Sequence, residues 1–297
     1  MKTFKFLLSI ILSAIVLTGC DIGEVIKDEA TKELKTQSKK ALDDLKNETF
    51  SKSTPKIQNS KDDLSLINAD TNDENYAFIN DNKTTLTEAD QKLIKQKGNS
   101  EFWALYSDLD QLGRGGKVTA LVTHQAVQNN SSSAKERPQF ASSVHLAGEY
   151  KDGTYDPVKQ TWKGTESNNQ ILQLDGYRGY IYNKSHSLAW SLGGDMETHN
   201  LTLGTRAQNV GSNKASEGGG MGYPETQVRN VIYDNPEAKI FYEVTPVYKD
   251  DELLPRGSHV RAYSINDNGK TINLNVWIAN KQKGVTINYN NGTYTTE

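Results

Sequence analysis

Apolar residues are distributed unevenly along the chain, and their spacing divides it into three parts. A continuous apolar run covers residues 6–17. Residues 21–74 are rich in Lys, Asp, Glu, Asn, Ser and Thr and contain one aromatic residue, Phe50. Such a segment buries too little apolar surface to offset the entropy lost on ordering it. The pattern therefore predicts a signal sequence at residues 1–19, a polar spacer at 20–74 and a folded domain at 75–297.

From Tyr76 onward, the spacing of apolar residues predicts a domain that mixes helices and strands. Apolar residues recur at helical spacing over residues 101–112, which predicts a helix there. Proline is tolerated in the first turn of a helix, so a second helix is expected from Pro224 to about Tyr233. Strands are expected at residues 117–127, 177–183, 239–248, 260–265, 272–279 and 285–294. These elements predict an α+β fold with a mixed, mainly antiparallel sheet and flanking helices.

The spacer is the acidic part of the chain. It carries 13 acidic and 9 basic residues, and the whole chain has a formal charge of −3, which leaves about −1 for the domain. Apolar residues between Ile26 and Leu45 recur at spacings of four and seven, so an amphipathic helix could form over about residues 24–46. A solvated stalk is favoured over a partner-binding helix. The domain also lacks the large positive net charge of many nucleic-acid-binding proteins. Any contact with nucleic acid must therefore come from a local site on its surface.

The N-terminus carries the features of an export signal. Lys2 and Lys5 precede the apolar run, which ends in Leu17-Thr18-Gly19-Cys20. The run is short for a membrane helix, which needs roughly 20 residues, so a single-pass anchor is the weaker interpretation. Its end resembles the bacterial lipoprotein signal, in which the cysteine becomes the lipidated first residue; an ordinary signal peptide cleaved near Gly19 is the alternative. We expect an extracytoplasmic protein that is lipid-anchored to a Gram-positive-like cell membrane through Cys20, or secreted.

Cys20 is the only cysteine, so the chain can form neither an intramolecular disulfide nor a cysteine-based zinc centre. Candidate chemistry instead begins at His186, at the end of a predicted strand. We expect the following loop to expose this histidine. Its unperturbed pKa of about 6.5 would keep much of it neutral near pH 7, as a general base requires.

Several short motifs precede and follow His186 along the chain. They are Tyr106 to Gly116, Asn183-Lys184-Ser185-His186, the pair Asn200 and Asn209, Gly204 to Asn209, and Glu225. Together they resemble the DNA/RNA non-specific endonucleases of the ββα-metal (His-Me finger) class. The similarity is greatest to the secreted and DNA-entry nucleases of Gram-positive bacteria, and it covers roughly residues 75–297. It implies a ββα-metal active-site module and hydrolysis of phosphodiester bonds in DNA, with RNA left open, and with little sequence preference.

The resemblance also implies roles for individual residues. Asn209 would bind one Mg²⁺, for which Mn²⁺ is an alternative, while His186 deprotonates the attacking water. Glu225 would fix a metal-bound water, with Glu217 as the alternative carboxylate. Asn200 would hold the histidine loop against the metal helix, although a turn-forming role is an equal alternative. Further phosphate-binding candidates are Arg206, Lys184, Arg178 and Arg114. No protein partner is implied.

The sequence departs from the wider signature at three positions. Asn183, Lys184 and Ser185 stand where the class has Asp, Arg and Gly, so the roles of those three residues do not carry over. These departures leave open an inactive nuclease or a toxin on the same fold. The alternative from another class is a non-catalytic surface lipoprotein that binds nucleic acid or another ligand. Such a protein would have no need of His186, Asn209 and Glu225 together.

Overall fold

The structure is a computed structural model that describes residues 54–58, 62–212 and 218–297. The predicted signal, Cys20, the helix expected near residues 24–46 and Glu217 lie outside these residues. None of the helices in the described ranges is long and apolar enough to cross a membrane.

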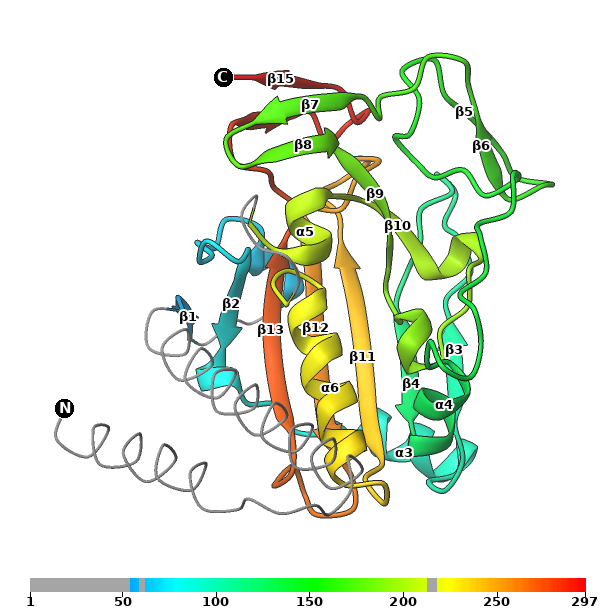
Figure 1. Cartoon of the computed structure of the whole chain (residues 1–297), viewed down its shortest axis with the longest axis vertical. Coiled ribbons are helices and arrows are strands. Elements are labelled where there is room, and N and C mark those ends of the chain that lie inside the picture. Colours follow the sequence, from blue (N-terminus) through cyan, green and yellow to red (C-terminus); the bar gives the residue numbers. More distant parts are fainter. Residues whose placement is uncertain (1–53, 59–61, 213–217) are drawn as a thin grey trace, which may run out of the picture. The chain divides into compact units, whose positions relative to one another are not determined.

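A seven-stranded sheet forms the centre of residues 54–297 (Figure 1). Its strands, in spatial order, are β1 (Lys56–Ile57), β2 (Tyr76–Ile79), β13 (Asn273–Ala279), β12 (Gly257–Ser264), β11 (Ile240–Val247), β4 (Val118–Val122) and β3 (Trp103–Tyr106). Only the β1–β2 pair is parallel. The predicted α+β class and the mainly antiparallel sheet are therefore confirmed.

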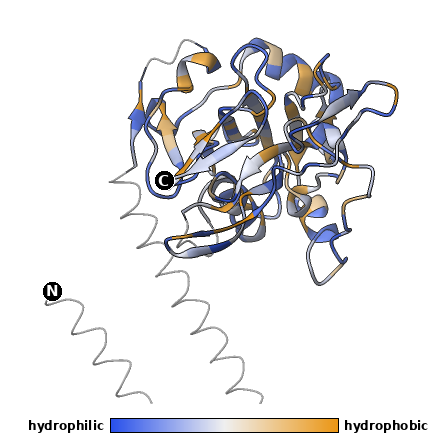
Figure 2. Cartoon of the chain, turned by 90° about the horizontal axis from the view of Figure 1, so that it is seen from above, coloured by the Kyte–Doolittle hydropathy of each residue, from blue (hydrophilic) through white to orange (hydrophobic). Residues whose placement is uncertain are grey.

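The main core lies between this sheet and helix α6 (Gly222–Asp234), which crosses the front of the sheet in Figure 1. Val228 and Ile232 of α6 are fully buried against apolar residues that alternate along the strands, as a sheet with one face against a helix requires. Pro224 lies in the first turn of α6, as predicted. The short helix α4 (His124–Asn129) lies beside the same core. Figure 2 shows mainly hydrophilic residues in the peripheral loops.

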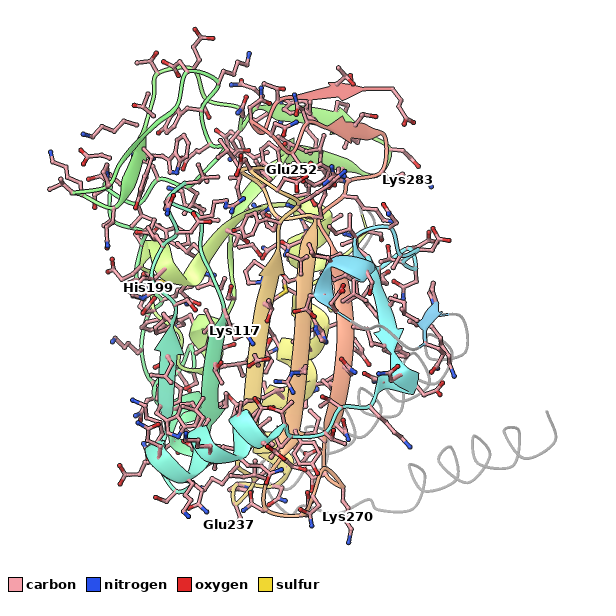
Figure 3. The ribbon with its side chains drawn as sticks, turned by 180° about the vertical axis from the view of Figure 1, so that it is seen from behind. Lys117, His199, Glu237, Glu252, Lys270 and Lys283 are labelled. Carbon is pink, nitrogen blue, oxygen red and sulfur yellow. The ribbon has the colours of Figure 1, made fainter. Side chains whose placement is uncertain are left out.

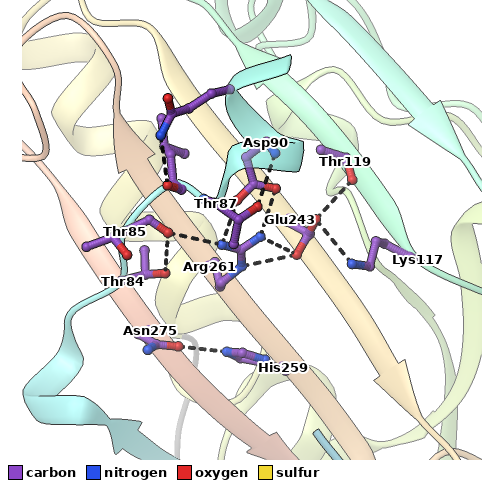
Figure 4. Close-up of polar contacts among 12 residues, drawn as sticks. Thr84, Thr85, Thr87, Asp90, Lys117, Thr119, Glu243, His259, Arg261 and Asn275 are labelled. Atoms are coloured by element: carbon purple, nitrogen blue, oxygen red, sulfur yellow. Dashed lines mark hydrogen bonds and ion pairs between the residues drawn. The ribbon is translucent and has the colours of Figure 1, made fainter. Parts of the chain in front are cut away.

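Part of the opposite face of the sheet is polar, and a separate apolar cluster covers another part of it. Helix α3 (Glu88–Lys97) covers part of it and begins with a capping box between Thr87 and Asp90. Arg261 on β12 bonds to both Asp90 and Glu243, with N–O distances of 3.0 and 2.7 Å (Figure 4). Lys117 also lies on this face (Figure 3) and pairs with Glu243. The charges on this back face are thus neutralised in one network.

A hairpin and a short helix stand on the front of the molecule. Strands β9 (Tyr182–His186) and β10 (Leu201–Thr205) pair antiparallel, and α5 (Arg206–Val210) follows β10 without an intervening loop. At Gly204 in β10 a Cβ would lie 2.1 Å from Gln208 Oε1, so a larger residue there would require the Gln208 side chain to move. The result is a ββα unit packed beside α6, which confirms the predicted module.

The remaining elements are short. They are the two-stranded sheets β5 (Thr154–Asp156) with β6 (Thr161–Lys163), β7 (Ile171–Leu174) with β8 (Tyr177–Tyr180), and β14 (Val285–Ile287) with β15 (Tyr294–Thr296), and the 3₁₀ turns η1 (Asp63–Leu66), η2 (Asn80–Asn82), η3 (Trp190–Leu192) and η4 (Thr198–Asn200). The segment predicted as a strand at 285–294, with a turn at Asn291-Gly292, is a hairpin. The strand predicted at 177–183 divides between β8 and β9.

Two further segments differ from the sequence-based expectation. The helix predicted over residues 101–112 is wrong: Trp103–Tyr106 pair with β4, and the Asp110 carboxylate then folds the chain into a turn by accepting the Leu112 N–H at 2.9 Å. The predicted spacer extends too far. Lys56 and Ile57 pair with β2, and the side chain of Leu66 is fully buried in a cluster with Trp277. Residues before 75 therefore contribute to the fold.

Candidate active site

The ββα unit brings the predicted histidine and asparagine motifs together. His186 pairs with Leu201 at the end of the hairpin, and Asn209 lies on the helix that follows β10. The Ser185 hydroxyl donates to Asn209 Oδ1 at 3.2 Å, and Asn209 Nδ2 donates to Asn183 Oδ1 at 3.5 Å. These two bonds fix Asn209, the candidate metal ligand, to strand β9, which also carries His186, the candidate base.

The imidazole of His186 is buried, with 8% of the residue exposed. The Phe140 ring stacks on it with centroids 5.6 Å apart, and Met196 Sδ lies 3.3 Å from Nε2. The expectation that the loop after β9 exposes His186 was therefore wrong, since the loops around it cover the ring. Burial lowers the pKa of His186 to about 4, and the charge of Arg137 adds to this shift while Asp195 opposes it.

Asn200 ties down the loop that follows His186. Its side chain is fully buried and donates to the carbonyls of Leu188 and Asp195, both at 2.9 Å. Its Oδ1 accepts the Leu188 N–H at 2.8 Å, and its own carbonyl accepts the Ser187 N–H at 2.8 Å. Every polar group of this amide is used within the loop. These bonds stay within the loop and none of them reaches α5, so they fit both the predicted holding role and the turn-forming alternative.

Glu225 lies one turn into α6, which begins directly against α5. The Met221 N–H donates to the Gln208 carbonyl at 2.8 Å, and Gly222 faces the carbonyl of Asn209. Burial raises the pKa of the Glu225 carboxyl to about 8, and Arg229 and Arg137 offset only part of this shift. Glu225 is thus a half-buried residue with a desolvated carboxyl, on the helix that begins against α5.

Arg137 is a site residue that the sequence did not reveal. It is exposed in the loop after α4, and its guanidinium lies over the Phe140 ring that stacks on His186, 5.9 Å from the centroid. Its charge lowers the pKa of both His186 and Glu225, so it lies within electrostatic range of both groups. The surrounding stretch Lys-Glu-Arg-Pro-Gln-Phe has no motif and no regular period, so only the fold identifies it.

The four predicted phosphate contacts have different surroundings. Arg206 begins α5, its guanidinium lies 5.4 Å from the Tyr177 ring, and its buried Nη1 has no hydrogen-bond partner among the described atoms. Arg178 is exposed on the β7–β8 hairpin. The Lys184 ammonium donates to the Val144 carbonyl and lies 3.6 Å from Glu149.

Arg114 has a structural role instead of the predicted phosphate contact. Its Nε donates to Asp110 at 2.6 Å, and its Nη1 donates to the carbonyls of Asp250 and Glu252, both at 2.8 Å. The same guanidinium stacks over Tyr248 at 4.5 Å from the centroid. Because these contacts bind the guanidinium to the protein itself, the structure gives Arg114 no place in a phosphate groove.

Comparison with known proteins identifies the family. The sequence profile of the DNA/RNA non-specific endonucleases matches residues 156–266, a range that contains His186, Asn200, Asn209 and Glu225. A relative from Streptococcus dysgalactiae subsp. equisimilis, named deoxyribonuclease, is 30% identical over 256 residues, which cover 79% of this chain and 73% of the relative. The chain belongs to the DNA/RNA non-specific endonuclease family. This endonuclease therefore acts on nucleic acid.

Solved structures resemble this endonuclease over most of the described residues. The structure of Sda1 nuclease with a bound zinc ion is 27% identical, matches with a TM-score of 0.60 and covers 75% of this chain and 97% of that one. NucA from Streptococcus agalactiae with a bound magnesium ion is 19% identical, with a TM-score of 0.53, and covers 76% and 89%. The second likeness concerns the fold alone.

Proposed function

We propose that this endonuclease cleaves DNA, and RNA as a second substrate, by metal-assisted hydrolysis with His186 as the general base and Asn209 as the protein ligand of one Mg²⁺. The observation that carries the proposal is the Ser185–Asn209 hydrogen bond of 3.2 Å, because it couples the base strand to the metal-ligand helix. A binding module has no need of this coupling. A nuclease needs base and ion on opposite sides of one phosphate.

The side chains near Asn209 suit a hard cation. Asn209, Asn183 and Ser185 offer amide and hydroxyl oxygens. Mg²⁺ prefers oxygen ligands and keeps several waters in addition. Asn209 would hold the ion directly, and Glu225 would orient one of its waters. The pKa of Glu225, raised to about 8 by burial, shows a carboxyl that lacks full compensation, and a bound cation would supply it. When bound, Mg²⁺ would polarise the scissile phosphate and stabilise the departing 3′ oxygen.

His186 is in the neutral form that a general base needs, although burial weakens its basicity. Burial holds its pKa at about 4, so the imidazole is neutral at pH 7 and one ring nitrogen can accept a proton. Asn200 fixes the loop beside it through its four hydrogen bonds. Movement of the Met196 thioether from Nε2 would admit the attacking water, because a thioether is only a weak hydrogen-bond partner.

Arg137 would bind the phosphate between the base and the metal. Its guanidinium is exposed and acts on both His186 and Glu225, which is where the scissile phosphate would lie. Replacing it by alanine should lower kcat/KM by about 10- to 100-fold, the usual cost of a hydrogen bond to a charged group. Arg137→Lys should retain part of the rate, and the exposed Lys159→Ala is the matched charge control. Equal kcat/KM for Arg137→Ala and wild type would exclude the contact.

We also propose that the enzyme works outside the cytoplasm, tethered by a lipid on Cys20 after removal of residues 1–19. The sequence Leu17-Thr18-Gly19-Cys20 and the polar segment that follows support this proposal. Cys20→Ser should move nuclease activity from the membrane fraction to the medium. Activity that stays in the membrane fraction would contradict lipid anchoring.

Cleavage of supercoiled plasmid tests the proposed chemistry. The wild-type protein with Mg²⁺ should degrade the plasmid, a chelator should stop the reaction, and His186→Ala or Asn209→Ala should lower the rate by at least ~100-fold. His124→Ala, which removes a histidine of α4, is the control. Plasmid that stays intact with Mg²⁺, Mn²⁺ and Zn²⁺ would show a nuclease fold used for binding alone.

A further inference from the structure

Asp195 connects the base candidate to the rest of the protein. Its backbone carbonyl accepts a hydrogen bond from Asn200 Nδ2 at 2.9 Å, and the His186 imidazole also hydrogen-bonds to the Asp195 backbone. A histidine with one ring nitrogen held by a carbonyl presents the other nitrogen in a fixed direction. The position of Asp195 therefore decides where the imidazole points.

The side chain of Asp195 is itself held by two aromatic residues. Its Oδ2 lies 2.8 Å from His199 Nε2, and its Oδ1 accepts the Glu197 N–H at 3.1 Å. The Tyr106 hydroxyl hydrogen-bonds to both the backbone and the carboxylate of Asp195, and burial beside this carboxylate raises the pKa of Tyr106 well above its usual value. The rings of Tyr106 and His199 stack with centroids 4.4 Å apart.

Tyr106 comes from a segment that is anchored independently. It ends the edge strand β3, where it pairs with Val118. The chain then turns back to Gly115, where a Cβ would approach the Leu201 carbonyl to 2.8 Å, and the Tyr248 hydroxyl donates to the Gly115 carbonyl at 3.0 Å. Residues 106–116 therefore brace the start of β10, which is the strand opposite His186.

We propose that Tyr106, Asp195 and His199 are positioning residues for His186, which hold the Asp195 carbonyl against the imidazole and so keep the free ring nitrogen directed at the attacking water. The proposal rests on the role of His186 as base. The Asp195 carboxylate also stabilises the imidazolium that forms when His186 takes the proton. Arg137 is the other charged group that acts on His186, and the uncharged Phe140 and Met196 cover the ring.

Two conservative variants separate positioning from folding. Tyr106→Phe keeps the ring that stacks on His199 and removes the hydroxyl bonds to Asp195. Asp195→Asn keeps the backbone carbonyl and removes the charge. The matched controls lie elsewhere: Tyr289→Phe removes a buried hydroxyl that donates to the Asn280 carbonyl at 2.5 Å, and Asp63→Asn removes the carboxylate 2.6 Å from His259.

Steady-state cleavage of a DNA duplex with Mg²⁺ should show a fall in kcat with little change in KM. General-base catalysis contributes about 10²- to 10⁴-fold, so misdirecting the base should cost about 10-fold in each variant. Asp195→Asn should also move the acidic limb of the kcat–pH profile to lower pH, because Asp195 raises the pKa of His186. The two control variants should keep the wild-type kcat and pH profile.

The outcomes distinguish this inference from the proposed function. If the wild type and His186→Ala are equally inactive, the proposed function fails first. If His186→Ala alone is inactive, while Tyr106→Phe and Asp195→Asn keep the wild-type kcat and pH profile, the positioning role is overturned. A third outcome is a lower kcat together with a lower melting temperature, while the acidic limb of the kcat–pH profile of Asp195→Asn stays at the wild-type pH. This outcome would show that the residues act only on folding, and it would also overturn the positioning role.

Discussion

His186 and Glu225 are buried titratable groups whose pKa values move in opposite directions. Burial lowers the pKa of His186 to about 4 and raises that of Glu225 to about 8, so desolvation favours the neutral form of both. Arg137 partly offsets the shift at Glu225 and reinforces the one at His186. Near pH 7 the site therefore combines a neutral imidazole with a largely protonated carboxyl.

The shift at His186 has a consequence for stability. The unfolded histidine has a pKa near 6.5, so the unfolded chain takes up the proton first as the pH falls. Stability should drop between pH 6.5 and pH 4, and the His186 contribution to this loss should reach about 3 kcal/mol. Urea unfolding at both pH values measures it, with His186→Gln as the reference that lacks the titration. An equal loss in wild type and His186→Gln would contradict the buried neutral imidazole.

The His186 motif could be predicted from sequence because its members are close together along the chain. The hairpin and α5 then place Asn183, Ser185 and Asn209 in contact. Arg137 could not be predicted, because its loop has no periodic pattern and it approaches His186 only through the fold. Burial of His186 was missed for a similar reason, since Phe140 and Met196 come from separate loops.

At the scale of elements, the capped start of α5 determines where Asn209 lies. The Thr205 hydroxyl accepts the Gln208 N–H at 2.9 Å and donates to the Lys281 carbonyl at 2.9 Å. The Asn280 side chain also accepts the Thr205 N–H at 2.8 Å. Helix α5 is only five residues long, so packing and capping, more than helix propensity, must hold it in place.

Thr205→Ala should lower the free energy of unfolding by about 1–2 kcal/mol, because it removes a helix cap that is buried and doubly bonded. It should also weaken Mg²⁺ binding, since α5 carries the ligand. Calorimetric melting and metal titration measure the two effects. Thr123→Ala is the control, because Thr123 caps α4 through a longer bond of 3.4 Å and carries no ligand candidate. Unchanged metal affinity in Thr205→Ala would contradict the placement of the ligand on α5.

The sequence predicted some elements well and others not at all. Pro224 marks the first turn of α6 through a property of proline itself, so the helix there is confirmed. Residues 101–112 have helical spacing, yet Trp103–Tyr106 form an edge strand because β4 offers them hydrogen-bond partners. Strand pairing depends on residues far away in the sequence, and here it overrides the helical spacing of the apolar residues in this segment.

At the scale of the whole molecule, the two faces of the large sheet have different functions. The front carries α6 and the ββα unit, whereas the back carries the network of Arg261, Asp90, Glu243 and Lys117 (Figure 4). The spacer was expected to reach residue 74 because it is polar, but burial of Leu66 depends on tertiary contacts that no local pattern shows.

Arg261→Ala should destabilise the protein by about 3–5 kcal/mol, because it leaves two largely buried carboxylates without their partner. The kcat of the folded variant should stay at the wild-type value, since the network lies on the face opposite the site. Chemical unfolding and steady-state cleavage measure the two effects. The exposed Lys56–Asp81 pair gives the contrast: Lys56→Ala should cost less than about 1 kcal/mol. A fall in kcat for folded Arg261→Ala would contradict the independence of the two faces.

Chemical rescue of a histidine-free variant tests the central claim most directly. His186→Gly should be nearly inactive on DNA with Mg²⁺, and added imidazole should restore cleavage in proportion to the concentration of its neutral form. Asn209→Ala should not respond to imidazole, because it lacks the metal ligand and keeps the base. We expect imidazole to rescue His186→Gly and to leave Asn209→Ala inactive. Imidazole-independent rates in His186→Gly, equal to those of the wild type, would contradict the assignment of His186 as the base.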